Sequence, residues 1–425
     1  MIVTVPGDKS ITQRALILSA LAEGRSRLRG LLPGADPAST AGAVRGLGAL
    51  VPALPPNGAE IVVQGKGLDG LAAPGAPLDL GNSGTGTRLL MGVLAAQRFR
   101  SVLTGDASLS SRPMGRVTRP LAQMGARFRY LERDDRLPLE IEGGRLAPFA
   151  YDLPVASAQV KSALLLAGLA GRVPVALTEP GRSRDHTERM LSALGAGVVS
   201  EPIGERWGVR LDDPPARIWP LDIDVPGDLS SAAFLIVLAL LGGARGELTV
   251  RGIGMNPTRT GVLPVLERMG ARLRIHTEPE QGGEPVGAIT AAPTTLSATD
   301  VTAEDVVLAI DEVPILAAAG ARAQGVTRIT GAEELRVKET DRVKALVANL
   351  RAVGVSVEEL PDGLEVEGSD RPLAGEVESF DDHRIAMAFG VLGALAGNDI
   401  RVRGRECVDV SFPGFWEQLE RLARR

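Results

Sequence analysis

The 425-residue chain has a single cysteine, Cys407, and only three histidines, His186, His276 and His383. One cysteine excludes an internal disulfide framework and is typical of a reducing compartment. The histidines lack the spacing of metal ligands, and no base lies near Cys407 in the sequence. We therefore expect neither a metal site nor a cysteine nucleophile.

Aromatic side chains make up 3% of the chain, and the net charge is −5. Nucleic-acid binding calls for a basic face and aromatic stacking platforms. No uncharged apolar run approaches membrane-spanning length, and the first residues lack the basic and apolar regions of a signal peptide. We expect a soluble, cytoplasmic protein that binds neither nucleic acid nor membrane.

Lysine is also scarce, with five residues against 42 arginines. A lysine in so biased a chain can mark a place that needs a compact ammonium group. This weak signal draws attention to Lys9 and Lys338.

The chain does contain a duplication. The sequence Val-Pro-Gly-Asp at residues 5–8 recurs at residues 225–228, and each copy ends a β-like run and opens an apolar helix. Lys9 and Arg14 follow the first copy, at a helix start whose free N–H groups favour anions. Leu229 replaces the lysine in the second copy. The asymmetry predicts function in one copy, although residues 5–14 alone would also fit an ordinary capped turn.

A shorter repeat divides the chain further. Helix-like segments end in glycine before a β run at residues 48, 125, 195, 270 and 354, with further apolar helices between them. Residues 51–60 and 276–285 have the composition of turn-rich loops. We expect an α/β (α+β) chain of six units in two similar globular domains, residues 8–225 and residues 1–7 plus 226–425.

Several helix starts carry groups suited to anions. Residues 80–88 form a glycine-rich junction without the pattern of a P-loop or of a dinucleotide fingerprint, and a tight turn is the alternative. Two carboxylates at residues 311–312 precede an apolar helix. Four cations stand at predicted helix starts, against the macrodipole: Lys9, Arg88, Arg342 and Arg384. Together they indicate one strongly anionic ligand between the halves.

These residues together resemble the 5-enolpyruvylshikimate-3-phosphate (EPSP) synthases, or 3-phosphoshikimate 1-carboxyvinyltransferases. The resemblance covers nearly the whole chain. Its most specific stretches are residues 7–14, 80–88, 112–113, 338–342, 382–387 and 411–413. It implies the enolpyruvyl transferase fold, an inside-out α/β barrel in which each domain has three βαβαββ repeats.

The resemblance also implies an activity. The enolpyruvyl group of phosphoenolpyruvate would pass to the 5-hydroxyl of shikimate 3-phosphate, with release of phosphate, in the shikimate pathway to chorismate and aromatic amino acids. The two small molecules would be its only partners, no metal or organic cofactor would be needed, and the chain would be monomeric.

Site residues follow position by position from the resemblance. Shikimate 3-phosphate would be held by Lys9, Ser10, Arg14, Ser157, Ala158, Gln159, Ser183, Arg184, Asp311 and Lys338. Phosphoenolpyruvate would be held by Lys9, Asn82, Gly84, Arg112, Gln159, Arg342 and Arg384. The catalytic residues would be Asp311 at the attacking hydroxyl, Glu339 as proton donor to the methylene carbon, and Lys9.

The chain departs from the family pattern at some positions. Val410 stands where many members have a lysine, a contact that Arg405 could replace. Ala158 is typical of a glyphosate-tolerant branch, yet Gly84 stands where tolerant enzymes often carry alanine. We therefore expect inhibition by glyphosate.

Two other functions are alternatives. The sibling enolpyruvyl transferase acting on UDP-N-acetylglucosamine typically uses a cysteine near residues 108–113, where this chain has none. A non-catalytic anion-binding repeat protein would not need both Asp311 and Glu339 beside cations.

Overall fold

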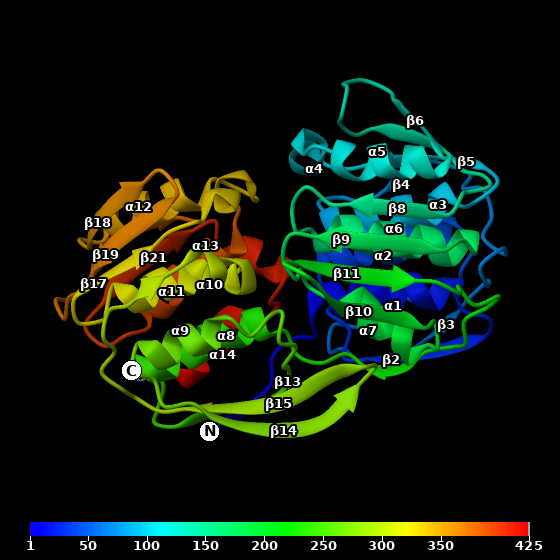
Figure 1. Cartoon of the computed structure of the whole chain (residues 1–425). Coiled ribbons are helices and arrows are strands. Elements are labelled where there is room, and N and C mark those ends of the chain that lie inside the picture. Colours follow the sequence, from blue (N-terminus) through cyan, green and yellow to red (C-terminus); the bar gives the residue numbers. More distant parts are fainter. Residues whose placement is uncertain (424–425) are drawn as a thin grey trace. The chain divides into compact units, whose positions relative to one another are not determined.

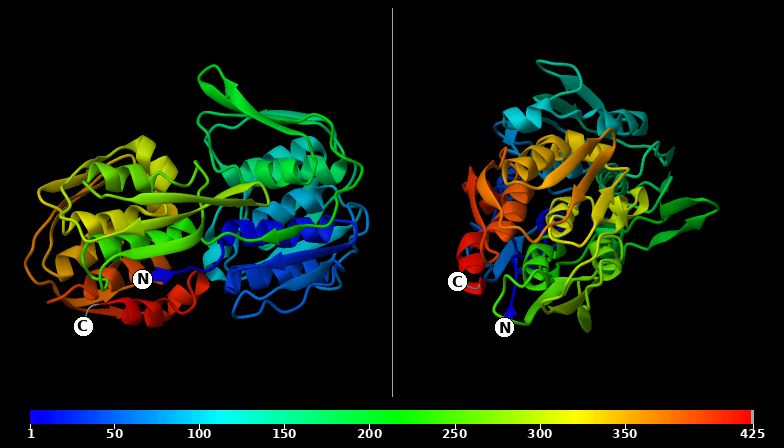
Figure 2. Two further views of the ribbon diagram at one scale, coloured as in Figure 1. Left: turned by 90° about the horizontal axis from the view of Figure 1, so that it is seen from below. Right: turned by 90° about the vertical axis from the view of Figure 1, so that its left-hand side faces the viewer.

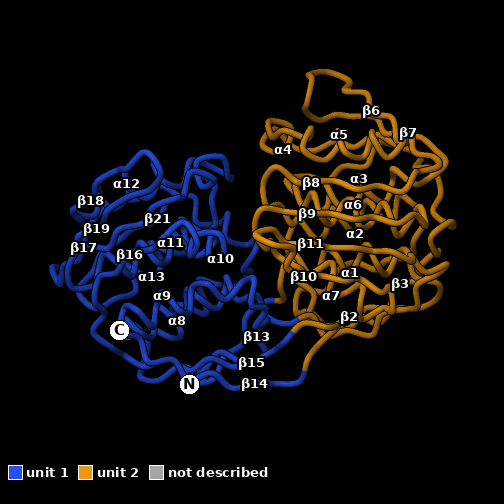
Figure 3. The backbone as a smooth tube through the Cα atoms, viewed as in Figure 1, with its two compact units in different colours: residues 1–6, 226–279, 285–425 blue, residues 7–225, 280–284 orange. Residues whose placement is uncertain are grey.

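The computed structural model describes residues 1–423 (Figure 1). The chain forms two compact units (Figure 3). Unit 1 comprises residues 1–6, 226–279 and 285–425, and unit 2 comprises residues 7–225 and 280–284. The division into two functional domains, residues 8–225 and residues 1–7 plus 226–425, stays a prediction.

Unit 2 contains three small mixed sheets. The first has the order β12-β2-β3 (Asp222–Asp224, Arg25–Arg29, Ile61–Gln64), and the second β4-β5-β7-β6 (Leu78–Asp79, Arg100–Thr104, Leu139–Glu142, Arg127–Tyr130). The third is β10-β11-β9-β8 (Val198–Ile203, Arg206–Leu211, Val175–Glu179, Phe149–Asp152). Each sheet joins one parallel pair to antiparallel strands, so one topology recurs.

Three helices of unit 2 are buried almost all round: α1 (Lys9–Leu21), α3 (Gly84–Ala95) and α6 (Ala158–Gly171). Most of their side chains are apolar, as in helices inside a core, although polar groups such as Arg14 and Lys161 are buried with them. A β-carbon at Gly92 of α3 would come within 2.0 Å of the Ala163 carbonyl oxygen on α6, so glycine permits the close approach. The other helices are α2 (Ala35–Gly46), α4 (Ala107–Ser111), α5 (Gly115–Met124) and α7 (His186–Ala193).

Unit 1 repeats the mixed-sheet pattern. Its sheets have the orders β1-β13-β15-β14 (Ile2–Val3, Leu248–Gly254, Glu284–Ala291, Arg274–Gln281) and β16-β17-β19-β18 (Asp300–Val301, Val326–Ile329, Gly363–Glu367, Ser356–Leu360). A parallel pair, β20-β21 (Ala374–Glu378, Asp399–Arg403), forms the third. Met1 and Ala423 both lie near residues 244–247 of this unit (Figure 2).

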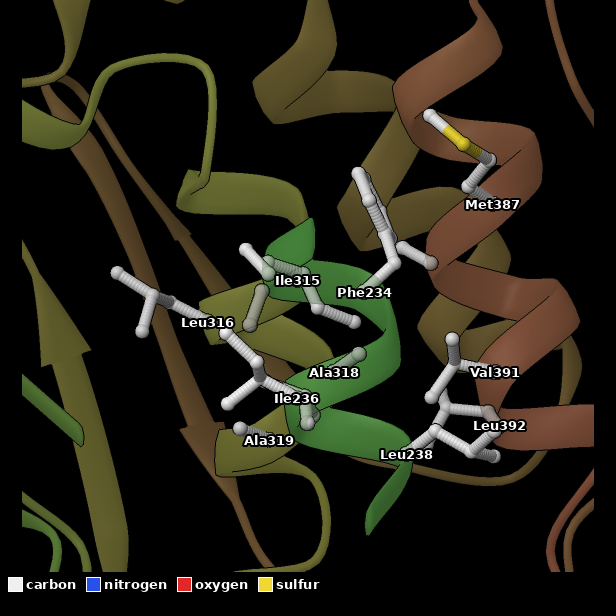
Figure 4. Packing of buried hydrophobic residues seen from close by; sticks show 14 of the residues in the cluster. Phe234, Ile236, Leu238, Ile315, Leu316, Ala318, Ala319, Met387, Val391 and Leu392 are labelled. Atoms are coloured by element: carbon white, nitrogen blue, oxygen red, sulfur yellow. The ribbon is translucent and has the colours of Figure 1, made fainter. Parts of the chain in front are cut away.

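The core of unit 1 is built from three apolar helices, α8 (Leu229–Leu240), α11 (Val313–Gly320) and α13 (His383–Gly393). Figure 4 shows Phe234 and Leu238 of α8 with Ile315 of α11 and Val391 of α13 in one cluster. The remaining helices are α9 (Val262–Arg268), α10 (Ala303–Ala309), α12 (Arg342–Ala352) and α14 (Phe415–Leu422), with short turns η1 (Glu333–Val337) and η2 (Arg405–Val410).

The structure confirms the helix starts after both Val-Pro-Gly-Asp copies. Asp8 caps α1 by accepting a hydrogen bond from the Ile11 N–H at 2.8 Å, and Asp228 caps α8 in the same role. The expectation of a loop at residues 276–285 is wrong. Strands β14 and β15 form a hairpin there, because Gly282 and Gly283 adopt the positive φ angles that a tight hairpin turn requires.

Candidate functional site

The start of α1 carries the first group of site residues in unit 2. The Nζ of Lys9 lies 3.3 Å from Asp36 of α2 and remains partly exposed. Lys9 and Ser10 occupy the first helical turn, where backbone N–H groups have no partner within the helix. The ammonium group and the helix dipole both favour an anion at this position.

Arg14 is a buried cation on the same helix. Its guanidinium donates hydrogen bonds to Thr187 Oγ1 at 2.7 Å, Ser162 Oγ at 2.9 Å and the Ser10 carbonyl at 3.0 Å. Burial lowers the pKa of Arg14 to about 10, although nearby carboxylates, Glu188 first, partly oppose this. The group therefore stays charged at neutral pH, hydrogen-bonded to neutral oxygens, in a place that favours a bound anion.

The glycine-rich junction before α3 joins four of the predicted residues. Arg112 donates to Asn82 Oδ1 at 2.6 Å, Arg88 donates to Gln159 Oε1 at 2.8 Å, and Gln159 donates to Thr85 Oγ1 at 3.0 Å. A β-carbon at Gly84 would lie 2.9 Å from Nη1 of Arg88 and 3.4 Å from Nη1 of Arg112. The predicted residues Asn82, Gly84, Arg112 and Gln159 therefore lie together.

Electrostatics at this junction also favour an anion. Arg88 is largely desolvated, and burial lowers its pKa to about 10, with the neighbouring charges of Arg112 and Arg116 acting in the same direction. Two arginines beside one another repel unless an anion lies between them.

The starts of α6 and α7 place the remaining residues of unit 2. Ser157 caps α6 through its hydroxyl, followed by Ala158. Ser183 lies in the loop between β9 and α7, where its N–H and its hydroxyl donate to the two oxygens of Glu179 at 2.9 and 2.6 Å. Arg184 is the next residue, directly before the Asp185 N-cap of α7.

In unit 1, Arg342 is the centre of a carboxylate cluster. Its fully buried guanidinium donates to Asp382 and Glu339 at 2.7 Å each and to Asp311 at 3.3 Å. Burial alone would lower the pKa of Arg342, but Asp382, Glu339 and Asp311 raise it above its ordinary value. Asp382 is not among the site residues predicted from the sequence, and it is the most buried of the three partners.

Arg384 holds Asp311 from a second side. Its Nε lies 3.5 Å from Asp311 Oδ1, and its Nη1 donates to the Asp311 carbonyl at 3.3 Å. Lys338 and Glu339 follow η1 directly, and the Glu339 carboxylate is partly exposed. The structure therefore brings Asp311, Glu339, Arg342 and Arg384 together within unit 1.

The contact that Arg405 could supply in place of the one missing at Val410 stays a prediction. The Arg405 guanidinium stacks on Trp416, 4.5 Å from the ring centroid. Within residues 1–423, no group of three or more His, Cys, Asp or Glu side chains is arranged to hold a metal. Over the same residues, no helix has the length and apolarity needed to cross a membrane.

The family is decided by comparison with known proteins. A sequence model described as EPSP synthase (3-phosphoshikimate 1-carboxyvinyltransferase) matches residues 1–419. The chain belongs to the EPSP synthase family. This confirms the resemblance drawn from the motifs.

Individual EPSP synthases match over their full length. The 3-phosphoshikimate 1-carboxyvinyltransferase of Alkaliphilus metalliredigens is 46% identical over 99% of this chain and 97% of its own, and that of Geobacter metallireducens is 47% identical over 100% and 96%. The structure of EPSP synthase from Acinetobacter baumannii superposes with a TM-score of 0.88 at 42% identity, covering 100% of this chain and 95% of the other.

A more distant structure shares the fold alone. The enolpyruvyl transferase NikO from Streptomyces tendae has a TM-score of 0.76 at 20% identity, covering 99% of this chain and 94% of the other. The mixed α/β fold with its repeated small mixed sheets is therefore that of the EPSP synthases and of an enolpyruvyl transferase.

The one cysteine of this EPSP synthase family member offers a test of local burial. Burial raises the pKa of Cys407 to about 11, against 9.0 for an ordinary thiol. At pH 8 the thiolate fraction of Cys407 is then about 100-fold lower than that of an ordinary thiol. A thiolate of higher pKa is more nucleophilic, which offsets about tenfold of this loss in rate. We expect an aromatic disulfide reagent to label Cys407 about tenfold more slowly than free cysteine, with the rate rising towards pH 11. Labelling as fast as free cysteine at pH 8 would contradict this.

Proposed function

We propose that this chain transfers the enolpyruvyl group of phosphoenolpyruvate to the 5-hydroxyl of shikimate 3-phosphate and releases phosphate. As an EPSP synthase it is a transferase of the shikimate pathway, which leads to the aromatic amino acids. The observation that carries the proposal is the family match along residues 1–419, on a chain that has both Asp311 and Glu339 beside arginines.

Shikimate 3-phosphate binds mainly to unit 2 in this proposal. The phosphate needs fixed cations and N–H donors, and the ring hydroxyls need donors and acceptors. The proposed residues of unit 2 are Lys9, Ser10, Arg14, Ser157, Ala158, Gln159, Ser183 and Arg184, and those of unit 1 are Asp311 and Lys338.

Phosphoenolpyruvate carries a phosphate and a carboxylate, and so needs several cations. We assign it to Lys9, Asn82, Gly84, Arg112, Gln159, Arg342 and Arg384. Two sets of hydrogen bonds support the first part of this set, because they hold the donors at the start of α3. Arg112 donates to Asn82, and Gln159 bonds to Arg88 and Thr85. An arginine already ordered loses less side-chain entropy when it binds an anion.

The carboxylates move the protons. Asp311, ionised between Arg342 and Arg384, accepts the proton of the 5-hydroxyl as its oxygen bonds to C2 of phosphoenolpyruvate. Glu339 gives a proton to C3, and a tetrahedral adduct results. Phosphate then leaves C2 while a proton is removed from C3, which restores the double bond. Lys9 and the arginines stabilise the phosphate charge as it develops, and these steps need no metal or organic cofactor.

Glu339 must be protonated when it acts. In the structure its carboxylate accepts from Arg342 at 2.7 Å, which favours the ionised form. An anion bound to Arg342 would compete for that N–H group and so favour protonated Glu339.

We further propose the division into domains, the oligomeric state and the cellular location. Residues 8–225 and residues 1–7 plus 226–425 would each form three βαβαββ repeats of an inside-out α/β barrel. The three sheets in each unit, each with a parallel pair, support this. A monomer in the cytoplasm is the state we expect.

The test is phosphate release by the purified chain. Release should require shikimate 3-phosphate and phosphoenolpyruvate together and should be unaffected by excess chelator. Release with UDP-N-acetylglucosamine as the acceptor instead would assign the sibling activity. No release with either acceptor would leave the anion-binding alternative.

Glyphosate inhibition tests the glycine-rich junction. A methyl group in Gly84→Ala would press on the tips of Arg88 and Arg112, where the family pattern implies that the inhibitor lies. We expect the half-inhibitory glyphosate concentration to rise about tenfold or more, as one misplaced methyl commonly costs. The KM for phosphoenolpyruvate should change less, and unchanged inhibition would refute the steric argument.

A further inference from the structure

A buried ionic cluster in unit 2 has no part in the reaction described above. Lys161 of α6, Glu179 at the end of β9 and Glu188 of α7 are each at least 97% buried (elements labelled in Figure 1). The Nζ of Lys161 lies 2.7 Å from Glu179, 2.8 Å from Glu188 and 3.3 Å from the Ser183 carbonyl oxygen. The contacts to Glu179 and to Ser183 are hydrogen bonds, whereas the contact to Glu188 is an ion pair.

Glu179 completes a clamp on Ser183. One carboxylate oxygen accepts from the Ser183 N–H at 2.9 Å and the other from the Ser183 hydroxyl at 2.6 Å. The carbonyl of Ser183 accepts from Lys161. All three polar groups of this one loop residue are therefore held by two buried side chains.

The clamp lies directly beside the proposed phosphate cations. Arg184 follows Ser183 in the chain, so fixing Ser183 fixes the backbone from which Arg184 projects. Ser162, next to Lys161 on α6, accepts a hydrogen bond from Arg14 at 2.9 Å. The same turn of α6 therefore supports both arginines assigned to shikimate 3-phosphate.

A purely stabilising role explains this arrangement poorly. Burying an ion pair usually gains little stability over an apolar pair of similar volume, because of the desolvation cost. Here both oxygens of Glu179 are directed to a loop residue. The Ser183 hydroxyl donates its one proton to Glu179.

We propose that Lys161 and Glu179 are positioning residues for the shikimate 3-phosphate subsite, which hold Ser183 and thereby Arg184 in place. The inference rests on the proposed function, which assigns Arg184 to that substrate. Neither residue contacts substrate in this role.

The chain offers a matched pair of variants. Glu179→Gln and Glu188→Gln each replace one buried carboxylate on the same lysine by an amide of equal size, but only Glu179 contacts Ser183. We expect Glu179→Gln to raise the Kd for shikimate 3-phosphate, measured by titration calorimetry, about tenfold, as loss of a supporting contact commonly does. Glu188→Gln leaves every contact of Ser183 in place and removes only a charge near Arg14, so it should raise the Kd less than Glu179→Gln does. The KM for phosphoenolpyruvate should move little in either variant.

Thermal unfolding of both variants shows whether a rise in Kd comes from lost positioning of Ser183 or from lost stability of the fold. Equal rises in Kd for the two variants, or an unchanged Kd in Glu179→Gln, would overturn the inference. If Glu179→Gln does not fold, Glu179→Asp keeps the charge but withdraws it by one methylene, and the same rise in Kd is expected. A wild-type chain that binds no shikimate 3-phosphate would overturn the proposed function, and this inference with it.

Discussion

Asp311→Asn should lower kcat by about 10²–10⁴-fold, the usual contribution of a general base. Asparagine keeps the shape of the side chain but cannot accept the proton of the attacking hydroxyl. The Kd for shikimate 3-phosphate should stay within a few-fold. Phosphoenolpyruvate should bind no more weakly, because Arg342 and Arg384 lose a competing carboxylate. Steady-state phosphate release and titration calorimetry measure the two effects.

Asp381→Asn is the matched control for that change. Asp381 is exposed and has a φ of 56°, a conformation that asparagine tolerates well. Its replacement should leave turnover within about twofold, as for surface substitutions in general. Full activity of Asp311→Asn would remove Asp311 from the mechanism.

Arg342→Met should have the second large effect, on both stability and turnover. The methionine would leave Asp382, which is fully buried, without the guanidinium that lies 2.7 Å away. Removing one partner of a buried ion pair costs about 3–5 kcal/mol. We expect a lower unfolding temperature and turnover reduced at least about 100-fold, since an arginine clamp on a reacting phosphate is lost.

Arg342→Lys separates the two effects. Lysine keeps the charge but lacks the planar, forked guanidinium that bonds to three carboxylates at once. It should therefore restore much of the stability and little of the turnover. Differential scanning calorimetry and phosphate release measure them on the same samples. A stable, fully active Arg342→Met would contradict both the structural and the catalytic role.

The sequence predicted best the features that depend on neighbouring residues, such as helix starts and buried apolar helices. The helix starts at Asp8, Ser157 and Asp382 carry side chains that cap the following turn, and the structure has helices at each. The apolar runs of α8 and α11 form part of the core, because a helix without a polar face is buried.

The sequence predicted worst what depends on partners far along the chain. Residues 276–285 are polar and rich in turn formers, and so resembled a loop, although Gly282-Gly283 is also a hairpin signal. Glu284 is fully buried against His186 Nδ1 at 2.7 Å, a pair 98 residues apart that no local pattern marks.

Lys161 illustrates the same limit. It stands in an apolar helix, and the local sequence assigns it no role. Its carboxylate partners at residues 179 and 188 come from two other elements, so only the folded chain brings them together.

The most direct test of the proposed chemistry is mass spectrometry of the product formed in D2O. A C3 carbon that gains a solvent proton becomes a methyl group before it loses one hydrogen. Most molecules of the enolpyruvyl product should therefore carry deuterium in the methylene group. A product without deuterium would contradict addition and elimination through Glu339, and no enolpyruvyl product at all would contradict the function itself.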